Sequence, residues 1–146
     1  MNSTLVGTTR PTRFFAAYFD NALGLACMVA SGSLLGEIAP TDTPGRWQLL
    51  VGLAVMSVYF LYFFIFEWLF NATLGKLFTG LTIRQLDGTK CGAKAAFLRT
   101  ITRPFEVNPI VIGCLPAAIL IRLSSRRQRW GDWLANTVVI ERPQII

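Results

Sequence analysis

The sequence predicts an all-α membrane protein with two full transmembrane helices, a third helix that is either broken and re-entrant or spanning, and a small cytoplasmic β-hairpin. Of the 146 residues, 53% are hydrophobic and 15% are charged, and the mean hydropathy is +0.48. Long apolar runs carry almost no charge, whereas Lys and Arg crowd the segments between them. A bilayer imposes this segregation because charges are expelled from hydrocarbon. A chain of this length forms one domain, predicted to cover residues 1–146.

The first two apolar runs cover residues 14–38 and 47–70. About 20 helical residues cross a hydrocarbon core of roughly 30 Å, so each run is long enough. The link between the runs contains two prolines and a glycine, which predict a short turn. Trp47 and Trp68 lie near the two ends of the second run and suit the two membrane interfaces. Two full crossings are therefore predicted.

Residues 71–104 are predicted to form a cytoplasmic loop that has structure of its own. Its β-branched residues predict a strand over residues 81–86. The Asp87-Gly88 pair that follows predicts a tight hairpin turn in which both residues have positive φ.

The end of this loop predicts an amphipathic helix over residues 93–103. Phe97 and Ile101 share one face of this helix, and Arg99 and Arg103 point the opposite way. A helix with this pattern can lie in the head-group layer of a membrane.

The third apolar run, residues 105–121, is shorter and contains Pro109, Gly113 and Pro116. Lys and Arg concentrate before the first run, after the second run and in the tail at 122–146. Because positive charges stay in the cytoplasm, all three segments are predicted to lie on that side. One complete crossing by the third run would carry the tail outside. We therefore favour a broken or re-entrant segment over a spanning helix.

This topology predicts a multi-pass protein of a cell membrane, expected to be a bacterial inner membrane, with a cytoplasmic N-terminus. A second strand is predicted over residues 137–140. It would lie on the same side as the first strand, so the two can pair near Ile83 and Val139.

Four charged residues lie in or beside the two spans, where charges are costly. A carboxylate at the bilayer centre costs about 2.5–3.5 kcal/mol on insertion scales, so Asp20 requires polar neighbours. Arg13 lies about two helical turns before Asp20 on the same face, and Glu67 and Lys76 fall in the same leaflet. The four are predicted to meet in a buried polar cluster. Such a cluster is either an ion or proton site or a structural lock that orients the helices.

The composition indicates little other chemistry. The sequence has no histidine, and its three cysteines match no metal or disulfide spacing. No catalytic, metal-binding or cofactor-binding residues are predicted, and an enzyme is not expected. The net charge is +6, and the basic residues lie beside the apolar runs. This placement favours anionic lipid over nucleic acid as the counter-charge. The basic residues expected to contact lipid head groups or a partner are Arg99, Arg103, Arg126, Arg127 and Arg129.

Several motifs resemble those of the RDD family of membrane proteins, which is named for an arginine and two aspartates. The opening motif is RFFAAYFDN, with Arg13 and Asp20. The middle motif is EWLFNATLGKLFTGLTIRQLDGT, and the closing motif is RRQRWGDWLANTVVI, with Asp132. The resemblance covers nearly the whole chain and adds Asp132 to the polar cluster. The chain departs from many members at Gly131, where they have His, and at Asn136, where they have Gly.

Two functions are compatible with these patterns. The first is transport of an ion or small solute through the intramembrane Arg/Asp cluster, which requires a homo-oligomer because two or three helices cannot enclose a path. The alternative is a non-catalytic accessory or anchoring subunit of a larger membrane protein complex. The resemblance implies both, since cation/proton exchange has been suggested for the family and some members look like parts of larger assemblies. The expected partners are the lipid bilayer and either further copies of the chain or another membrane protein.

Overall fold

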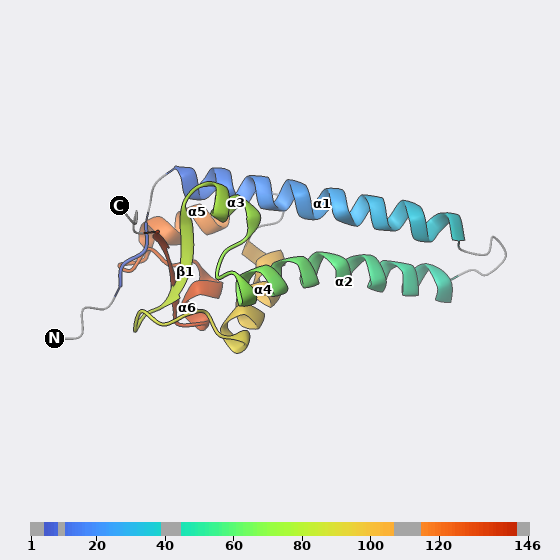
Figure 1. The fold of residues 1–146 in the computed structure, drawn as a ribbon. Coiled ribbons are helices and arrows are strands. Elements are labelled where there is room, and N and C mark those ends of the chain that lie inside the picture. The colour runs from blue at the N-terminus through green and yellow to red at the C-terminus, as the bar shows by residue number, and fades with distance from the viewer. Residues whose placement is uncertain (1–4, 9–10, 39–44, 107–114, 143–146) are drawn as a thin grey trace.

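The computed structural model describes residues 5–8, 11–38, 45–106 and 115–142 (Figure 1). Two long helices, α1 (Thr12–Ile38) and α2 (Arg46–Leu69), run side by side as an extended hairpin. The remaining elements gather at one end of this hairpin, beside the start of α1 and the end of α2 (Figure 1). These elements are α3 (Leu74–Phe78), β1 (Leu81–Gln85), α4 (Ala93–Glu106), α5 (Leu115–Leu123), α6 (Trp130–Leu134) and β2 (Thr137–Glu141). The predicted mostly helical architecture with two long apolar helices is confirmed.

α1 and α2 have the length and composition of membrane-crossing helices. Their most apolar windows have mean hydropathies of 1.3 and 2.4, and only 22% and 11% of those windows is buried inside the protein. Large apolar side chains such as Val29, Leu50 and Leu53 are exposed along both helices. The helices pack closely at Gly24, where a Cβ atom would lie 2.9 Å from the Tyr59 ring. The exposed apolar surface is typical of helices that face lipid.

The two strands form a two-stranded antiparallel sheet in which Ile83 lies directly opposite Val139. The pairing that the sequence predicted near these two residues is therefore present. Both are almost completely buried, which explains why the register is well specified.

The sheet is not a hairpin, in contrast to the prediction, because its two strands are separated by α4, α5 and α6. The Asp87-Gly88 turn closes a much smaller loop, with Gly88 N–H donating to the Gln85 carbonyl oxygen at 2.9 Å. A single bridge between Arg84 and Lys90 follows this turn. Only Gly88 has positive φ, at 88°, whereas both turn residues were expected to have it. A type I turn followed by one left-handed residue accounts for this loop.

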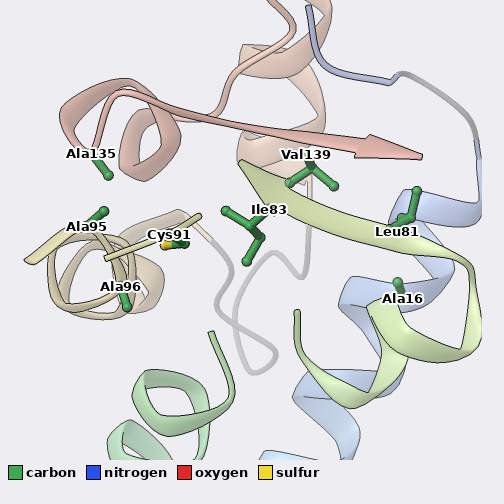
Figure 2. Close-up of a cluster of buried hydrophobic side chains, with 8 residues drawn as sticks. All are labelled: Ala16, Leu81, Ile83, Cys91, Ala95, Ala96, Ala135 and Val139. Atoms are coloured by element: carbon green, nitrogen blue, oxygen red, sulfur yellow. The ribbon is translucent and has the colours of Figure 1, made fainter. Parts of the chain in front are cut away.

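The apolar core lies between the sheet and the helices that pack on it. Figure 2 shows Ile83 of the sheet pointing toward Cys91 and the small side chains of α4, whereas Ala16 of α1 lies nearer to Leu81. The cluster consists of Ala16, Leu81, Ile83, Cys91, Ala95, Ala96, Ala135 and Val139. Half of its members are alanines, so the helices approach closely and the core is small.

α4 is amphipathic, as predicted, but its orientation is the reverse of the expected one. Phe97 and Ile101 are 55% and 48% exposed, whereas Arg99 and Arg103 are 0% and 2% exposed. The prediction assumed that the charged face would meet head groups. It was wrong because the interior of this end of the molecule contains carboxylates that pair with the arginines, so the apolar face remains on the surface.

The predicted third apolar segment, residues 105–121, falls partly outside the described residues. Phe105 and Glu106 end α4, and Leu115–Leu123 form α5. At 1.5 Å per residue, the nine residues of α5 extend roughly 14 Å, which is less than half of a hydrocarbon core. α5 alone is therefore too short to cross a bilayer.

Candidate functional site

Glu67, near the end of α2, is the first centre of a buried network of ion pairs. Its carboxylate lies 2.7 Å from Lys76 Nζ, 2.8 Å from Arg99 Nε and 2.9 Å from Arg103 Nη2. Lys76 reaches it because the chain turns back after α2 at Asn71, which has φ 54°, and then enters α3. Arg99 and Arg103 are one turn apart on α4 and therefore face the same way.

Asp132, in the first turn of α6, is the second centre. Its carboxylate lies 2.5 Å from both Arg13 Nη2 and Arg99 Nη1, and 3.1 Å from Arg129 Nε. Burial alone would raise the pKa of Asp132, but the guanidinium groups of Arg99, Arg129 and Arg13 hold that pKa well below its usual range. Arg99 contacts Glu67 and Asp132 together and so joins the two centres.

A third carboxylate, Glu106 at the end of α4, completes the network. It accepts a hydrogen bond from the Gly131 backbone N–H at 2.5 Å and lies 3.5 Å from Arg129 Nε. Burial raises the pKa of Glu106, although Arg129 opposes this shift. Sequence reasoning did not assign Glu106 to the site, and its position in an apolar run was the signal that could have done so. We call the following residues the ionic cluster: Arg13, Glu67, Lys76, Arg99, Arg103, Glu106, Arg129 and Asp132.

The basic residues expected to contact head groups or a partner divide into two sets. Arg99, Arg103 and Arg129 belong to the ionic cluster and are at most 7% exposed, so that expectation does not hold for them. Arg103 also stacks on an aromatic ring, with its guanidinium carbon 3.6 Å from the Phe63 centroid. Arg126 and Arg127 are exposed, and for them the contact with lipid or a partner stays a prediction.

Asp20 is buried beside the ionic cluster and is bound by uncharged donors. It accepts hydrogen bonds from Gly75 N–H at 2.7 Å, from Tyr62 Oη at 3.1 Å and from Thr73 Oγ1. Among the described residues, no Lys or Arg forms an ion pair with it. The sequence placed Arg13 on the same helix face as Asp20, but Arg13 pairs with Asp132 instead.

Gly75 is required where α3 meets α1. A Cβ atom there would lie 2.5 Å from the Ala16 carbonyl oxygen and 3.0 Å from Asp20 Cγ. Only glycine permits this approach, which brings the Gly75 N–H onto the Asp20 carboxylate. Gly75 and Thr73 are thus positioning residues of the site that the predicted cluster did not include.

A small cavity of about 30 Å³ lies where the ionic cluster meets Asp20. The volume suffices for one or two water molecules. Burial lowers the pKa of Lys76, one of its lining residues, to about 8, although the Glu67 carboxylate opposes this shift. Charged side chains line it together with apolar ones, and the charged residues are Arg13, Asp20, Lys76, Arg99, Arg103 and Arg129.

The order and spacing of these residues correspond to a known family. The sequence profile of the RDD family matches residues 9–136. The chain belongs to the RDD family. No curated protein and no solved structure matches it significantly. The RDD match and the two membrane-compatible helices together indicate a membrane protein.

The structure separates the three residues that resemble the signature residues of the RDD family. Arg13 and Asp132 form a direct ion pair although they are 119 positions apart. Asp20 instead joins α1 to α2 and α3 through Tyr62, Thr73 and Gly75. In the described part of the chain, the RDD domain has no group of three His, Cys, Asp or Glu side chains suited to a metal ion.

Proposed function

We propose that this RDD protein mediates the transport of a proton or small cation, with Asp20 as the exchanging carboxylate. The supporting observation is that Asp20 is 0% exposed in a membrane-type helix and has only uncharged hydrogen-bond donors among the described residues. Intramembrane carboxylates mark ion and proton pathways. A carboxylate whose charge is not balanced by an ion pair can be balanced by a mobile cation.

Lys76 makes the same site responsive to protons. It lines the cavity that Asp20 borders, and its pKa of about 8 lies near physiological pH. Loss of its proton would leave Glu67 with two of its three cations. A change of protonation at one residue therefore alters the charge of the whole site.

The transported ion must also cross the half of the membrane away from Asp20, and this part of its path requires further copies of the chain. From Gly24 to Ile38, α1 carries one charged residue, Glu37 at its end, and it packs against α2 through Gly24 and Tyr59. Nothing in the described part of one protomer offers a polar route across this half of the hairpin. The proposal therefore includes a homo-oligomer in which the exposed faces of the hairpins meet.

The pairing of β1 with β2 supports the proposed topology. Because the two strands are hydrogen-bonded, the segments before and after residues 105–121 lie on the same side of a bilayer crossed by α1 and α2. The pairing therefore supports a broken or re-entrant segment rather than one complete crossing. Positive charges favour the cytoplasm, so we propose that the end carrying the sheet is cytoplasmic in a bacterial inner membrane.

Flux measurements with purified protein in liposomes test the transport proposal. We expect Asp20→Asn to abolish the pH change that an imposed cation gradient drives in wild-type liposomes. The control variant is Asp87→Asn, because Asp87 is exposed in the turn after β1. Both variants should be produced and assembled like the wild type. Wild-type liposomes without a response, or full activity of Asp20→Asn, would refute the proposal.

A second candidate is a non-catalytic accessory subunit, which an apolar groove between α2 and α4 favours. The groove has a volume of about 350 Å³ and is lined by Phe60, Leu61, Phe64, Phe97, Thr100 and Ile101. Its apolar lining suits a helix of a partner membrane protein. Under this hypothesis, purification of the wild type in mild detergent recovers a stoichiometric partner. The partner should be absent from purified Phe97→Ser. It should remain with the control Phe15→Ser, which changes another exposed position. Recovery of the protein alone would contradict it.

A further inference from the structure

The buried charges around the cavity do not balance. Within the described residues, the site contains five buried cations: Arg13, Lys76, Arg99, Arg103 and Arg129. It contains four buried carboxylates: Asp20, Glu67, Glu106 and Asp132. One positive charge therefore remains when Lys76 is protonated and every carboxylate is ionised.

The other acidic residues in the described part of the chain do not supply the missing negative charge. The sequence has eight acidic residues, and four of them are already in the site. Glu37, Asp87 and Glu141 are exposed, and Asp42 lies in the segment between α1 and α2. Residues 107–114, which are outside the described part, include no Asp or Glu. An uncompensated buried charge is strongly destabilising, so a bound counter-ion is expected.

Unused hydrogen-bond donors indicate where the counter-ion binds. Arg99 Nη2, Arg103 Nε and Arg129 Nη2 are buried and have no hydrogen-bond partner among the residues that the structure describes. The three side chains line the same cavity. Leaving a buried donor unsatisfied costs about 1–3 kcal/mol, and more for a charged group. Glu106 Oε2 is also buried without a hydrogen-bond partner among the described residues, but Glu106 does not line the cavity, so the donors there require a further acceptor.

The geometry points to one small monovalent anion of halide size in this cavity. A volume of about 30 Å³ accommodates a single-atom anion but not a phosphate or sulfate group. Water molecules in the cavity can accept hydrogen bonds from these donors, but they bring no charge to balance the excess. A halide accepts from all three donors and balances the excess charge. Cation transport through Asp20 is not required for this inference, although a proton or cation bound to Asp20 would increase the excess positive charge of the site.

Direct binding of radioactive chloride to purified protein in detergent tests the inference. We expect saturable binding of about one chloride per chain that bromide displaces and gluconate, which is too large for the cavity, does not. Arg103→Gln should weaken binding about tenfold or more, because it removes the excess positive charge. The matched control is Arg126→Gln, since Arg126 is exposed and should leave binding unchanged.

Asp20→Asn should change the chloride affinity in the opposite direction to Arg103→Gln. Because misfolding would lower the affinity, a gain in affinity distinguishes an effect on the site from a loss of the fold. The substitution Asp20→Asn removes a negative charge that borders the cavity and keeps a similar shape, so chloride should bind several-fold more tightly. Absence of saturable chloride binding to the wild type would overturn the inference. Equal binding by wild type and a folded Arg103→Gln variant, or weaker binding by Asp20→Asn, would do so as well.

Discussion

Arg99 has two buried carboxylates as partners, and this double contact depends on the shape of its guanidinium group. Nε lies 2.8 Å from Glu67, and Nη1 lies 2.5 Å from Asp132 and 2.6 Å from Thr137 Oγ1. A planar fork with several donors can bind both acceptors at once, whereas a lysine ammonium is a single point charge. Arg99 therefore connects α2, α4, α6 and β2 through one side chain.

Removal of this connection should be strongly destabilising. We expect Arg99→Leu to lower the free energy of unfolding by about 3–5 kcal/mol, because Glu67 and Asp132 each lose a buried ion-pair partner. Arg99→Lys should recover only part of the loss. Thermal unfolding in mild detergent measures both variants, with Arg126→Leu at an exposed position as the control. Full recovery by lysine would show that charge alone is sufficient.

The short helix α3 holds the site residues of α1 and α2 in position. α3 packs on α1 through Gly75, places Lys76 against Glu67 and donates the Gly75 N–H to Asp20. Its five residues are too few to be stable as an isolated helix, so its position depends on these contacts. The packing of α3 on α1 is therefore a sensitive point of the fold.

A single methyl group at this contact tests that dependence. Gly75→Ala should destabilise the protein by about 1–3 kcal/mol, because the new Cβ meets backbone that no side-chain rotation can relieve. Gly52→Ala is the matched control, since nothing lies within 4 Å of its Cβ position. Alanine should stabilise α2 slightly there. Equal unfolding temperatures of the two variants in detergent would contradict the close approach of α3.

For the whole molecule, the sheet and the two long helices together predict a topology. β1 precedes residues 105–121 in the sequence and β2 follows them, and the two strands pair. Figure 1 shows both strands beside the start of α1 and the end of α2. The exposed residues Thr89 and Ser125 flank that segment in the sequence, whereas Gln48 lies at the start of α2. A bilayer crossed by the hairpin separates Gln48 from the other two residues.

Accessibility labelling can check this arrangement. Single cysteines at Thr89, Ser125 and Gln48, in a protein whose own cysteines are replaced by serine, should be labelled by a membrane-impermeant thiol reagent in intact and in permeabilised cells. We expect Thr89→Cys and Ser125→Cys to react only after permeabilisation, and Gln48→Cys to react in intact cells. Opposite behaviour of positions 89 and 125 would establish a third full crossing and contradict the strand pairing.

Local patterns in the sequence were sufficient for several features. The two long helices follow from long apolar runs with few charges, because hydrocarbon excludes charge over a fixed thickness. The strands near Ile83 and Val139 follow from β-branched residues, and the amphipathic character of α4 follows from its spacing of apolar and charged residues. The motifs of the RDD family, read in order, indicated Arg13, Asp20 and Asp132 as residues of interest.

Only the tertiary structure decided which charges meet and which face of α4 is inside. Arg13 pairs with Asp132 across 119 positions rather than with Asp20 on its own helix, because α6 brings the closing motif back to the start of α1. Amphipathic spacing shows that α4 has two faces, but it cannot tell which one is buried when the interior is ionic and the surface is apolar. Partner choice depends on distances between segments that are remote in the sequence, and those distances exist only in the folded chain.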